Sequence, residues 1–516
     1  FGPLSVIVAR SMRSVVVCRI LVALTLATAG VVCFGRLTIH PTDTLTGPQH
    51  GGANDLIEYF HPMHVAQYES LWTDGQWPTW DGHLQLGRPL AGNPQTAFYY
   101  PVNWIYFVLP SAALASWIMA LHHLLAGWGM YLLCRRYEIS RGAALLGAVA
   151  CLAAPFLIAH TAEGHYPMTC VAAWIPWTWL CYERFRRGKK YSLPLMALVL
   201  MSAFLASSAQ IFFYLIATTC FFWLVDLVKQ PAGVLPRQEL ALRWIGLGAL
   251  VVGLVAVELG PVWLTAKQSV RGQGHFSVEG AGGAEPSNLQ QLVCPLALGG
   301  PADYNANGGF FWDTLVSFGA LPFLLAVVGM VAAGNVYPLR RLAGVAIFGI
   351  IFALGDTTPV YTVLHKWVPG VATFQEPARF MYIATAAVAV LAAAGIDAAT
   401  RRLRQSESMA RIAMVITAVA VAGVAAELSF YGVAFTRTVP PDSRRVENPL
   451  AEKWANSSSD YRVFVEQELL SHEEAWRYDI AKTRGYDPFR FVRYQLFIQA
   501  MLNGRDEPLP GFQTDP

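Results

Sequence analysis

The sequence predicts an all-α polytopic membrane protein with about eleven transmembrane helices, a long structured first outer loop and a small α+β segment at the C-terminal end. Composition is the first observation behind this class. Of 516 residues, 54% are hydrophobic and only 14% are charged, with a mean hydropathy of +0.39. Such a chain is too apolar for a soluble protein of two or three domains. The other two observations are a series of apolar stretches and the alternation of basic residues between them.

The apolar stretches give the candidate spans. A helix needs roughly 20 apolar residues to cross the hydrocarbon layer of a membrane. Stretch 341–355 and the pair that meets at Ala209 and Gln210 are short or crowded, so composition sets their boundaries least sharply. The expected spans are 14–35, 112–133, 142–160, 167–182, 191–207, 210–228, 243–263, 313–333, 341–355, 379–396 and 411–431.

Basic residues in the short connections set the orientation. Lys and Arg concentrate on the cytoplasmic side of membrane proteins. Clusters such as 135–141, 184–190 and 401–411 fall in every second connection, which places the N-terminus in the cytoplasm. An odd number of spans then places the C-terminus outside. The long connections share the outer face, and we therefore expect function there, outside the cytoplasm.

This topology divides the chain into three segments. They are a cytoplasmic segment 1–13, a membrane domain 14–431 that includes the outer loop 36–111, and an extracytoplasmic segment 432–516. Because Met12 follows so closely after Phe1, we expect residues 1 to 12 to lie outside the native protein. The last segment has an alternating stretch, Tyr461 to Val465, followed by helix-like stretches. It should be a small α+β unit that is cut short at Pro516.

Several classes of site have no support in the sequence. Seven of the eight cysteines fall in or beside expected spans and Cys294 lies in an outer loop, so no disulfide framework and no CxxC metal pattern is indicated. The motifs GxxxxGK[ST], GxSxG and HExxH are absent. The net charge is only +3, with basic residues in short clusters beside apolar runs, which gives no support for a nucleic-acid partner.

The first outer loop carries the densest polar stretch, from Arg36 to about Tyr100. Polar residues at this density cannot lie in lipid, so the loop should hold its carboxylates in an ordered structure against the mouths of helices. Helical spacing places Asp55 and Glu58 on one face, with His61 following. Asp55 is the candidate general base toward an incoming hydroxyl, beside Glu58 and His61 as substrate-binding residues. The competing interpretation is that Asp55 caps the helix that follows.

Other candidate residues lie nearby in the expected topology. Asp43 is the second carboxylate of the loop, and it either orients the acceptor or joins Asp55 in holding a divalent cation, Mg²⁺ or Mn²⁺, through oxygen ligands. An ordinary turn residue is the interpretation that composition favours for Asp43. Glu163 and His165 flank a glycine in a very short outer turn that can face the first loop. Solvated turn residues are the competing interpretation for this pair, and the one favoured by position alone.

Arg379 lies at the start of an expected span, 379–396, on the outer side. A guanidinium at the headgroup layer can hold phosphate in a forked contact. Spacing alone favours ordinary snorkelling, or a salt bridge to Glu376. The aromatic segment Ala97 to Pro110 is short for a span and suits an interfacial or re-entrant helix.

Six short stretches, in their order and spacing, give a resemblance to a known family. They are Asp55 through Pro62, Gly75 through Pro89, Pro94 through Pro101, Glu258 through Arg271, Leu354 through Pro369 and Phe374 through Phe380. With them the chain resembles the YfhO-like bacterial membrane proteins, part of the wider group of GT-C fold glycosyltransferases. The resemblance runs from about Asp43 to Leu391, most of the membrane region.

The resemblance implies an enzyme that takes a sugar from a polyprenyl-phosphate carrier and transfers it, with inversion, to a cell-envelope glycan, lipid or protein acceptor on the outer face. Asp55 matches the first-loop acid expected to be the catalytic base. Arg379 lies in the matching Pro-Ala-Arg-Phe motif. Gln375 departs from the family, whose Phe-Arg-x-Pro-x-Arg pattern has Arg at that position. The resemblance gives no role to Asp43, Glu163 or His165.

Two other functions compete with this one. A transporter or lipid flippase for envelope precursors would be expected to keep ionisable groups near the bilayer midplane and to show repeated halves. No repeat is visible, and His122 and His123 are the ionisable residues nearest a span centre. A non-catalytic assembly protein is the third hypothesis, motivated by the outer tail and by the missing soluble-enzyme motifs.

Overall fold

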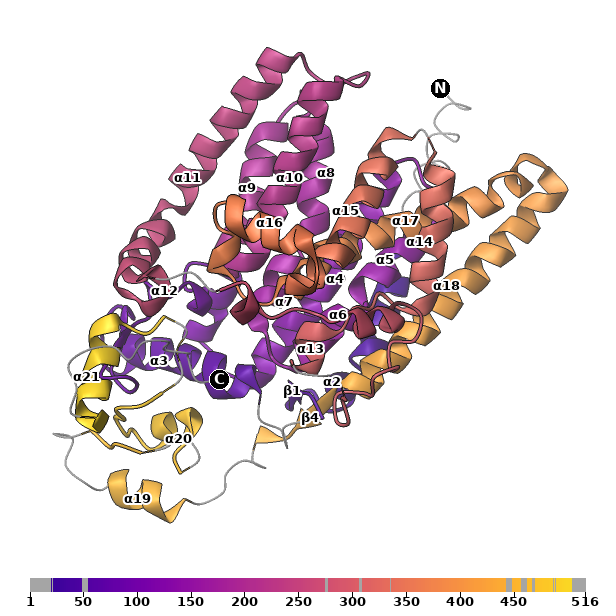
Figure 1. Ribbon diagram of the computed structural model, residues 1–516. Helices are drawn as coiled ribbons and strands as arrows, with labels where there is room; N and C mark the ends of the chain where they lie inside the picture. The colour runs from indigo at the N-terminus through magenta and orange to yellow at the C-terminus, as the bar shows by residue number, and fades with distance from the viewer. Residues whose placement is uncertain are drawn as a thin grey trace, which may run out of the picture.

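The computed structural model describes residues 20, 22–48, 54–273, 277–305, 309–334, 336–441, 448–455, 462–465, 469–485, 487 and 489–503. This part of the chain is mostly helical, with two small antiparallel sheets of two strands each (Figure 1). The predominantly α-helical fold is therefore confirmed. The expected cytoplasmic segment 1–13 lies outside the described residues.

Within the described ranges, six helices are long and apolar enough to cross a membrane. They are α4 (Ala112–Arg136), α5 with α6 (Arg141–Leu152 and Pro155–Ala162), α10 (Ala209–Lys229), α11 (Arg237–Gln268), α17 (Met381–Arg401) and α18 (Glu407–Phe435). Shorter apolar helices are Val22–Cys33, α9 (Ser192–Leu205) and α14 (Ala320–Ala333). A membrane protein with several spans is supported, but the expected number of eleven is not confirmed.

Prolines explain why some expected spans are broken. Stretch 142–160 divides into α5 and α6, with Pro155 as the first residue of α6. Stretch 167–182 divides into α7 (Tyr166–Ala172) and α8 (Ile175–Phe185), with Pro176 in the first turn of α8. Proline has no amide hydrogen and suits a first helical turn, but it interrupts a continuous helix. Composition therefore located two apolar segments, and the chain forms each of them as two shorter helices.

Helix α17 is the centre of the bundle. In its most apolar window 94% of the residues are buried, and it packs against α14, α5 and α15 (Tyr337–Ala353). Glycines allow the closest contact: a Cβ on Gly329 of α14 would lie 2.0 Å from the Leu391 carbonyl oxygen, and one on Gly395 2.0 Å from the Leu325 carbonyl oxygen. Small residues let membrane helices pack backbone to backbone. This packing fixes the position of η8 (Pro377–Phe380), which leads into α17.

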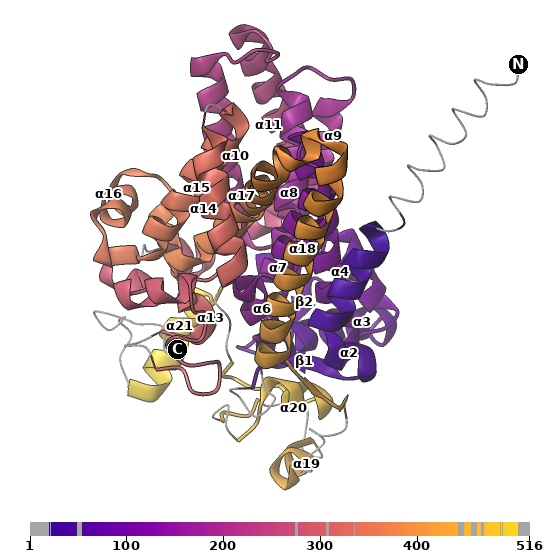
Figure 2. The same ribbon diagram turned by 90° about the vertical axis from the view of Figure 1, so that its right-hand side faces the viewer.

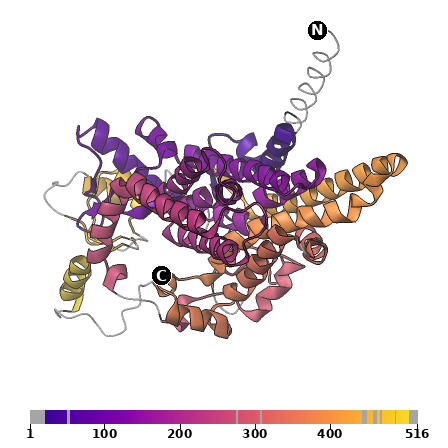
Figure 3. The ribbon, with the colours of Figure 1, turned by 90° about the horizontal axis from the view of Figure 1, so that it is seen from above.

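The two longest helices, α11 and α18, lie at opposite edges of the bundle, as the views from the side and from above show (Figures 1 and 3). Only 17% of the most apolar window of α11 and 22% of that of α18 are buried within the protein. Their exposed apolar side chains suit contact with lipid, because hydrocarbon removes the penalty that water imposes on such surfaces.

The first-loop elements gather at one end of the bundle (Figures 1 and 2). The loop elements are α2 (Gly35–Ile39), β1 (Thr44–Thr46), η1 (Leu56–Phe60), α3 (His61–Trp72), β2 (Trp80–Asp81), β3 (Arg88–Pro89), η2 (Pro94–Thr96) and η3 (Pro101–Phe107). Later outer elements are α12 (Val270–Gln273), η4 (Glu279–Ala281), η5 (Pro286–Leu292), α13 (Phe311–Thr314), η6 (Gly355–Thr357), α16 (Pro359–Trp367) and η7 (Val371–Thr373), while η9 (Leu403–Gln405) links α17 to α18. The segment expected as an interfacial helix contains η3, whose Trp104 and Ile105 are exposed.

The C-terminal tail packs onto the first loop. Its described elements are β4 (Arg437–Val439), α19 (Pro449–Ala455), α20 (His472–Arg477) and α21 (Val492–Asn503). Strand β4 pairs antiparallel with β1 of the first loop, Thr44 opposite Val439, so this sheet is shared between the two segments. A self-contained α+β unit at the C-terminus is not confirmed.

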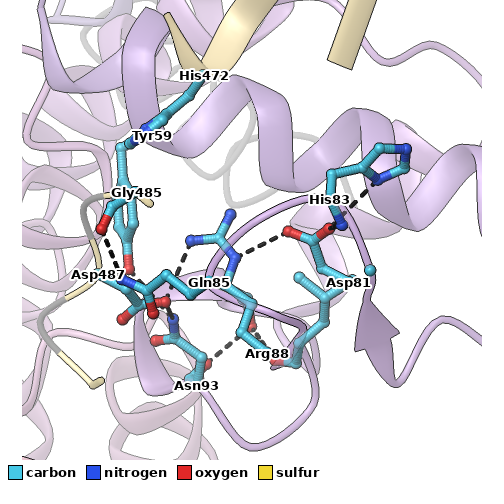
Figure 4. A network of polar contacts seen from close by, with 12 residues as sticks. Tyr59, Asp81, His83, Gln85, Arg88, Asn93, His472, Gly485 and Asp487 are labelled. Carbon is cyan, nitrogen blue, oxygen red and sulfur yellow. Dashed lines mark hydrogen bonds and ion pairs between the residues drawn. The ribbon is translucent and has the colours of Figure 1, made fainter. Parts of the chain in front are cut away.

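A buried network of charged and polar groups joins the loop to the tail (Figure 4). Arg88 donates from Nε to Asp81 at 2.8 Å and from Nη1 to Asp487 at 3.1 Å. Asn93 donates to the same Asp487 oxygen at 3.2 Å and to the hydroxyl of Tyr59 at 3.1 Å. Burial favours protonation of Asp81, but Arg88 and His83 outweigh it and the pKa of Asp81 is lowered. The network holds the loop that carries the candidate site against the tail.

A second buried network lies near the C-terminal ends of α8 and α10 and the N-terminal end of α15. Glu183 and Asp226 each contact both Arg186 and Arg341, at distances from 2.7 to 3.3 Å. Tyr182 also donates to Asp226, at 2.6 Å. Two carboxylates and two guanidinium groups balance in charge, as buried ions require. The network ties α8, α10 and α15 together.

Candidate functional site

Asp55 immediately precedes η1, and its side chain does not cap that helix. Neighbouring Asn54 makes the local contacts instead. The Asn54 side-chain oxygen accepts the Ile57 amide at 3.2 Å, and its amide donates to the carbonyl oxygens of Leu45 and Ala162, each at 3.0 Å. The capping interpretation of Asp55 is therefore wrong. The Asp55 carboxylate is left for other contacts, and its side chain is 42% exposed.

The turn between α6 and α7 lies directly against Asp55. The Asp55 amide donates to the Glu163 carbonyl oxygen at 3.0 Å, and Asp55 Oδ2 lies 3.4 Å from Nε2 of His165. Gly164 makes this approach feasible, because it has a φ of +82° and a Cβ there would lie 2.4 Å from the Leu56 nitrogen. Only glycine adopts this backbone conformation without strain. The structure thus brings together three of the predicted site residues, Asp55, Glu163 and His165.

A second histidine stands behind His165. Nδ1 of His160, on α6, lies 2.6 Å from Nδ1 of His165. The ring of His160 packs against that of Tyr382, on α17, with centroids 5.0 Å apart. His160 is fully buried and the His165 side chain is only 7% exposed, whereas Asp55 reaches the surface. The carboxylate is therefore the accessible end of a buried polar chain.

Arg379 lies at the other end of this chain. Its guanidinium forms a forked contact with Asp313 of α13, with Nε–Oδ1 at 2.9 Å and Nη2–Oδ2 at 3.2 Å, and Nη1 donates to Gln210 Oε1 at 3.2 Å. Trp312, beside Asp313, packs edge-on against His165 with centroids 6.2 Å apart. Asp55 and Arg379 thus belong to one cluster contributed by η1, α6, α13 and η8. The salt bridge expected between Arg379 and Glu376 is not the one observed, since the carboxylate partner is Asp313.

Glu376 adds a further ionisable group beside this cluster. Burial is the main cause that raises its pKa, and the nearby Asp313 carboxylate adds to the effect against the opposing influence of Arg379. Gln210 donates to the carbonyl oxygens of Gln375 and Glu376, at 2.5 and 3.3 Å, which fixes the turn before η8. Gln375 itself donates to the Gly280 carbonyl oxygen at 3.2 Å. Its side chain is therefore directed at the outer loop and contributes no cationic group.

The remaining predicted residues lie elsewhere. Asp43 is in the turn after α2, where its amide donates to the His40 carbonyl oxygen at 3.1 Å, in keeping with a turn residue. Glu58 and His61 lie toward the tail. The Glu58 carbonyl oxygen contacts Nδ1 of His472 at 3.1 Å. Burial, with a smaller contribution from Arg477 of α20, lowers the pKa of His61 to about 4.

No group of three or more His, Cys, Asp or Glu side chains suited to a metal ion occurs among the described residues. Asp55 lies against Nε2 of His165 and the backbone carbonyl of Glu163, contacts that are not the oxygen-rich set that Mg²⁺ or Mn²⁺ prefers. The expected divalent cation therefore has no fitting site in this part of the chain.

Sequence reasoning missed Asp313, His160 and Gln210. Asp313 is the first residue of an expected span and His160 the last of another, so both were assigned to lipid-embedded helices. The available signal was their position at the outer ends of those spans, since an ionisable group at a span end on the functional face is a candidate site residue.

No protein-family model matches the chain. No curated protein matches it. Among solved structures, the chain is similar to ArnT from Cupriavidus metallidurans bound to undecaprenyl phosphate, with a TM-score of 0.46 and 14% sequence identity over 93% of this chain and 88% of that one. This degree of similarity does not assign the chain to a family.

Proposed function

We propose that the chain is a membrane glycosyltransferase that moves a sugar from a polyprenyl-phosphate donor to a cell-envelope acceptor on the outer face, with Asp55 as general base. One observation carries the proposal. Asp55 is an accessible carboxylate backed by His165, and it shares a cluster with the cationic Arg379. A base for a hydroxyl and a cation for a phosphate are the two groups that this transfer needs. The motifs shared with YfhO-like proteins also support it.

The proposed reaction is a single inverting displacement. The acceptor oxygen forms a bond to the anomeric carbon of the sugar while the bond from that carbon to the phosphate oxygen breaks. Asp55 takes the proton of the acceptor hydroxyl. The electron pair of the broken bond stays with the polyprenyl phosphate, which leaves as an anion. Positioned acid–base groups contribute about 10²- to 10⁴-fold to such reactions.

Arg379 is suited to the leaving phosphate in spite of its contact with Asp313. A guanidinium has five N–H donors. Two donate to Asp313 and one to Gln210, which leaves two for a phosphate oxygen. Asp313 and Gln210 fix the plane of the guanidinium, so those two donors are aimed before substrate arrives. Such preorganisation strengthens the interaction with charge that develops in the transition state.

The test is direct assay of the purified protein with a panel of polyprenyl-phosphate sugars, each carrying a radiolabelled sugar, and with cell-envelope lipids and glycans as acceptors. We expect label to move covalently to an acceptor, with inversion at the anomeric carbon. Retention of configuration would contradict the single displacement. Movement of intact labelled lipid across proteoliposomes, with no covalent product, would instead establish the competing transporter or flippase function.

A further inference from the structure

Two histidines meet behind Asp55 in an arrangement that admits a single shared proton. Nδ1 of His160 lies 2.6 Å from Nδ1 of His165. A hydrogen bond between two imidazole nitrogens needs one N–H donor and one bare acceptor. Both residues are buried, so water does not offer either nitrogen an easy substitute partner. The protonation of one ring therefore dictates that of the other.

The far side of His160 indicates which ring donates. Nε2 of His160 is buried and has no hydrogen-bond partner in the described part of the chain. A buried N–H without a partner is rarer in proteins than an unsatisfied acceptor. Nε2 of His160 is therefore the bare nitrogen, and its Nδ1–H donates to Nδ1 of His165. Neutral His165 then carries its own proton on Nε2, the nitrogen that faces Asp55 Oδ2 at 3.4 Å.

The charged groups around the pair agree with this polarity. Asp55 lies on the side of His165 to which the N–H of Nε2 is directed. On the side of His160 are the Tyr382 ring and, beyond it, Arg379 with its partner Asp313. An N–H aimed at Asp55 stabilises a negative charge there, whereas a bare Nε2 of His165 would repel it.

We propose that His160 is a positioning residue for Asp55: it fixes His165 in the tautomer whose N–H is on Nε2, directed at Asp55, and His165 in turn keeps the Asp55 carboxylate aimed at the acceptor. The inference deepens the proposed function and rests on it for its catalytic consequence. The tautomer itself is a property of the protein without substrate. His160 touches neither substrate nor reacting atoms and acts only through His165.

The tautomer is measured first, by ¹⁵N NMR of histidine-labelled protein in detergent, with the His165 signals assigned from an H165N variant. We expect a protonated Nε2 and a bare Nδ1 on His165 near neutral pH. Phe at position 160 removes the donor, whereas Asn can place an N–H near the former Nδ1. H160F should therefore change the His165 signals and H160N should preserve them. A protonated Nδ1 on His165 in the wild-type protein would overturn the inference, whether or not transfer activity is found.

The kinetic readout uses the same variants. In H160F we expect kcat to fall about tenfold or more with KM unchanged, since orientation is part of what a general base contributes. H160N should restore kcat. His122, a buried histidine on α4 that contacts Tyr100, provides the control H122N, which should leave kcat unchanged. Equal loss in H160F and H160N would show a merely structural role.

Discussion

The Arg379 guanidinium donates two hydrogen bonds to the Asp313 carboxylate, Nε to Oδ1 at 2.9 Å and Nη2 to Oδ2 at 3.2 Å. Asp313 lies on α13, and Arg379 lies in η8, the last turn before α17. Because the contact fixes the plane of the guanidinium, the side chain is prepared to receive an anion in one orientation. This relationship gives the outer cluster a rigid cationic end opposite the accessible Asp55.

Replacing Arg379 by lysine tests this geometry. Lysine keeps the positive charge but cannot contact Asp313 twice and Gln210 at once. We expect kcat for sugar transfer to fall by about 100-fold or more, in line with the loss of an oriented donor to developing charge. The measurement is steady-state transfer from labelled donor. R404K is the matched control, because Arg404 pairs with Asp397 at the opposite end of α17. Wild-type kcat in R379K would show that the forked contact has no part in catalysis.

Gly164 should be required for the position of Asp55. In G164A the new Cβ would meet the Leu56 nitrogen, and the left-handed backbone costs about 1–2 kcal/mol for a residue other than glycine. We expect a lower unfolding temperature together with a loss of transfer. Gly75 provides the control: it also has a positive φ, of +64°, but has nothing within 4 Å of its Cβ position. If G75A and G164A lost stability and activity equally, strain alone would explain the result and the contact with η1 would be irrelevant.

The buried network of Glu183, Asp226, Arg186 and Arg341 should dominate stability. D226N removes the charge that faces both Arg186 and Arg341, leaving buried guanidinium groups without full compensation. Breaking a buried ion pair costs about 3–5 kcal/mol. D397N, in the more exposed pair with Arg404, should cost less than about 1 kcal/mol. Thermal unfolding in detergent distinguishes the two. Similar losses in both variants would mean that this network is not specially stabilising.

Docking of the tail onto the first loop should weaken in acid. Burial, then Lys482 and Arg88, lower the pKa of His472 to about 3, against an ordinary value of 6.5. The undocked residue binds a proton below about pH 6.5 and the docked one does not, so docking is stabilised above that pH and progressively lost as pH falls toward 3. His83 acts in the opposite sense: burial lowers its pKa, but Asp81 and Asp479 outweigh this and raise it, so its contribution fades as pH rises.

Limited proteolysis of the tail between pH 7 and pH 5 measures this effect. We expect cleavage to increase as pH falls in the wild-type protein. H472Q isolates His472 from His83, since glutamine can still donate to the Glu58 carbonyl oxygen but does not titrate. The variant should show a flatter pH dependence. An unchanged dependence in H472Q would assign the effect to other groups.

The sequence predicted the predominantly helical class of fold with several apolar spans, but not the contacts that hold the candidate residues. Charge alternation placed Asp55 and the Glu163–His165 turn on the same outer face, and the structure brings them into contact. His160 and Asp313 were missed because hydropathy assigns span ends by composition and does not register which side chains turn outward. The docking of the tail was unpredictable for a different reason: Arg88 and Asp487 are 399 positions apart, and no local pattern pairs them.

The central claim is that Asp55 is the general base of sugar transfer, and the most direct measurement is the transfer rate of D55N beside that of D74N. Asp74 is an exposed acid of the same outer loop, so its loss controls for a general change of charge. We expect D55N to bind the lipid-linked donor normally and to lose transfer by about 10²- to 10⁴-fold, with D74N unaffected. Full transfer activity in folded D55N would contradict the account.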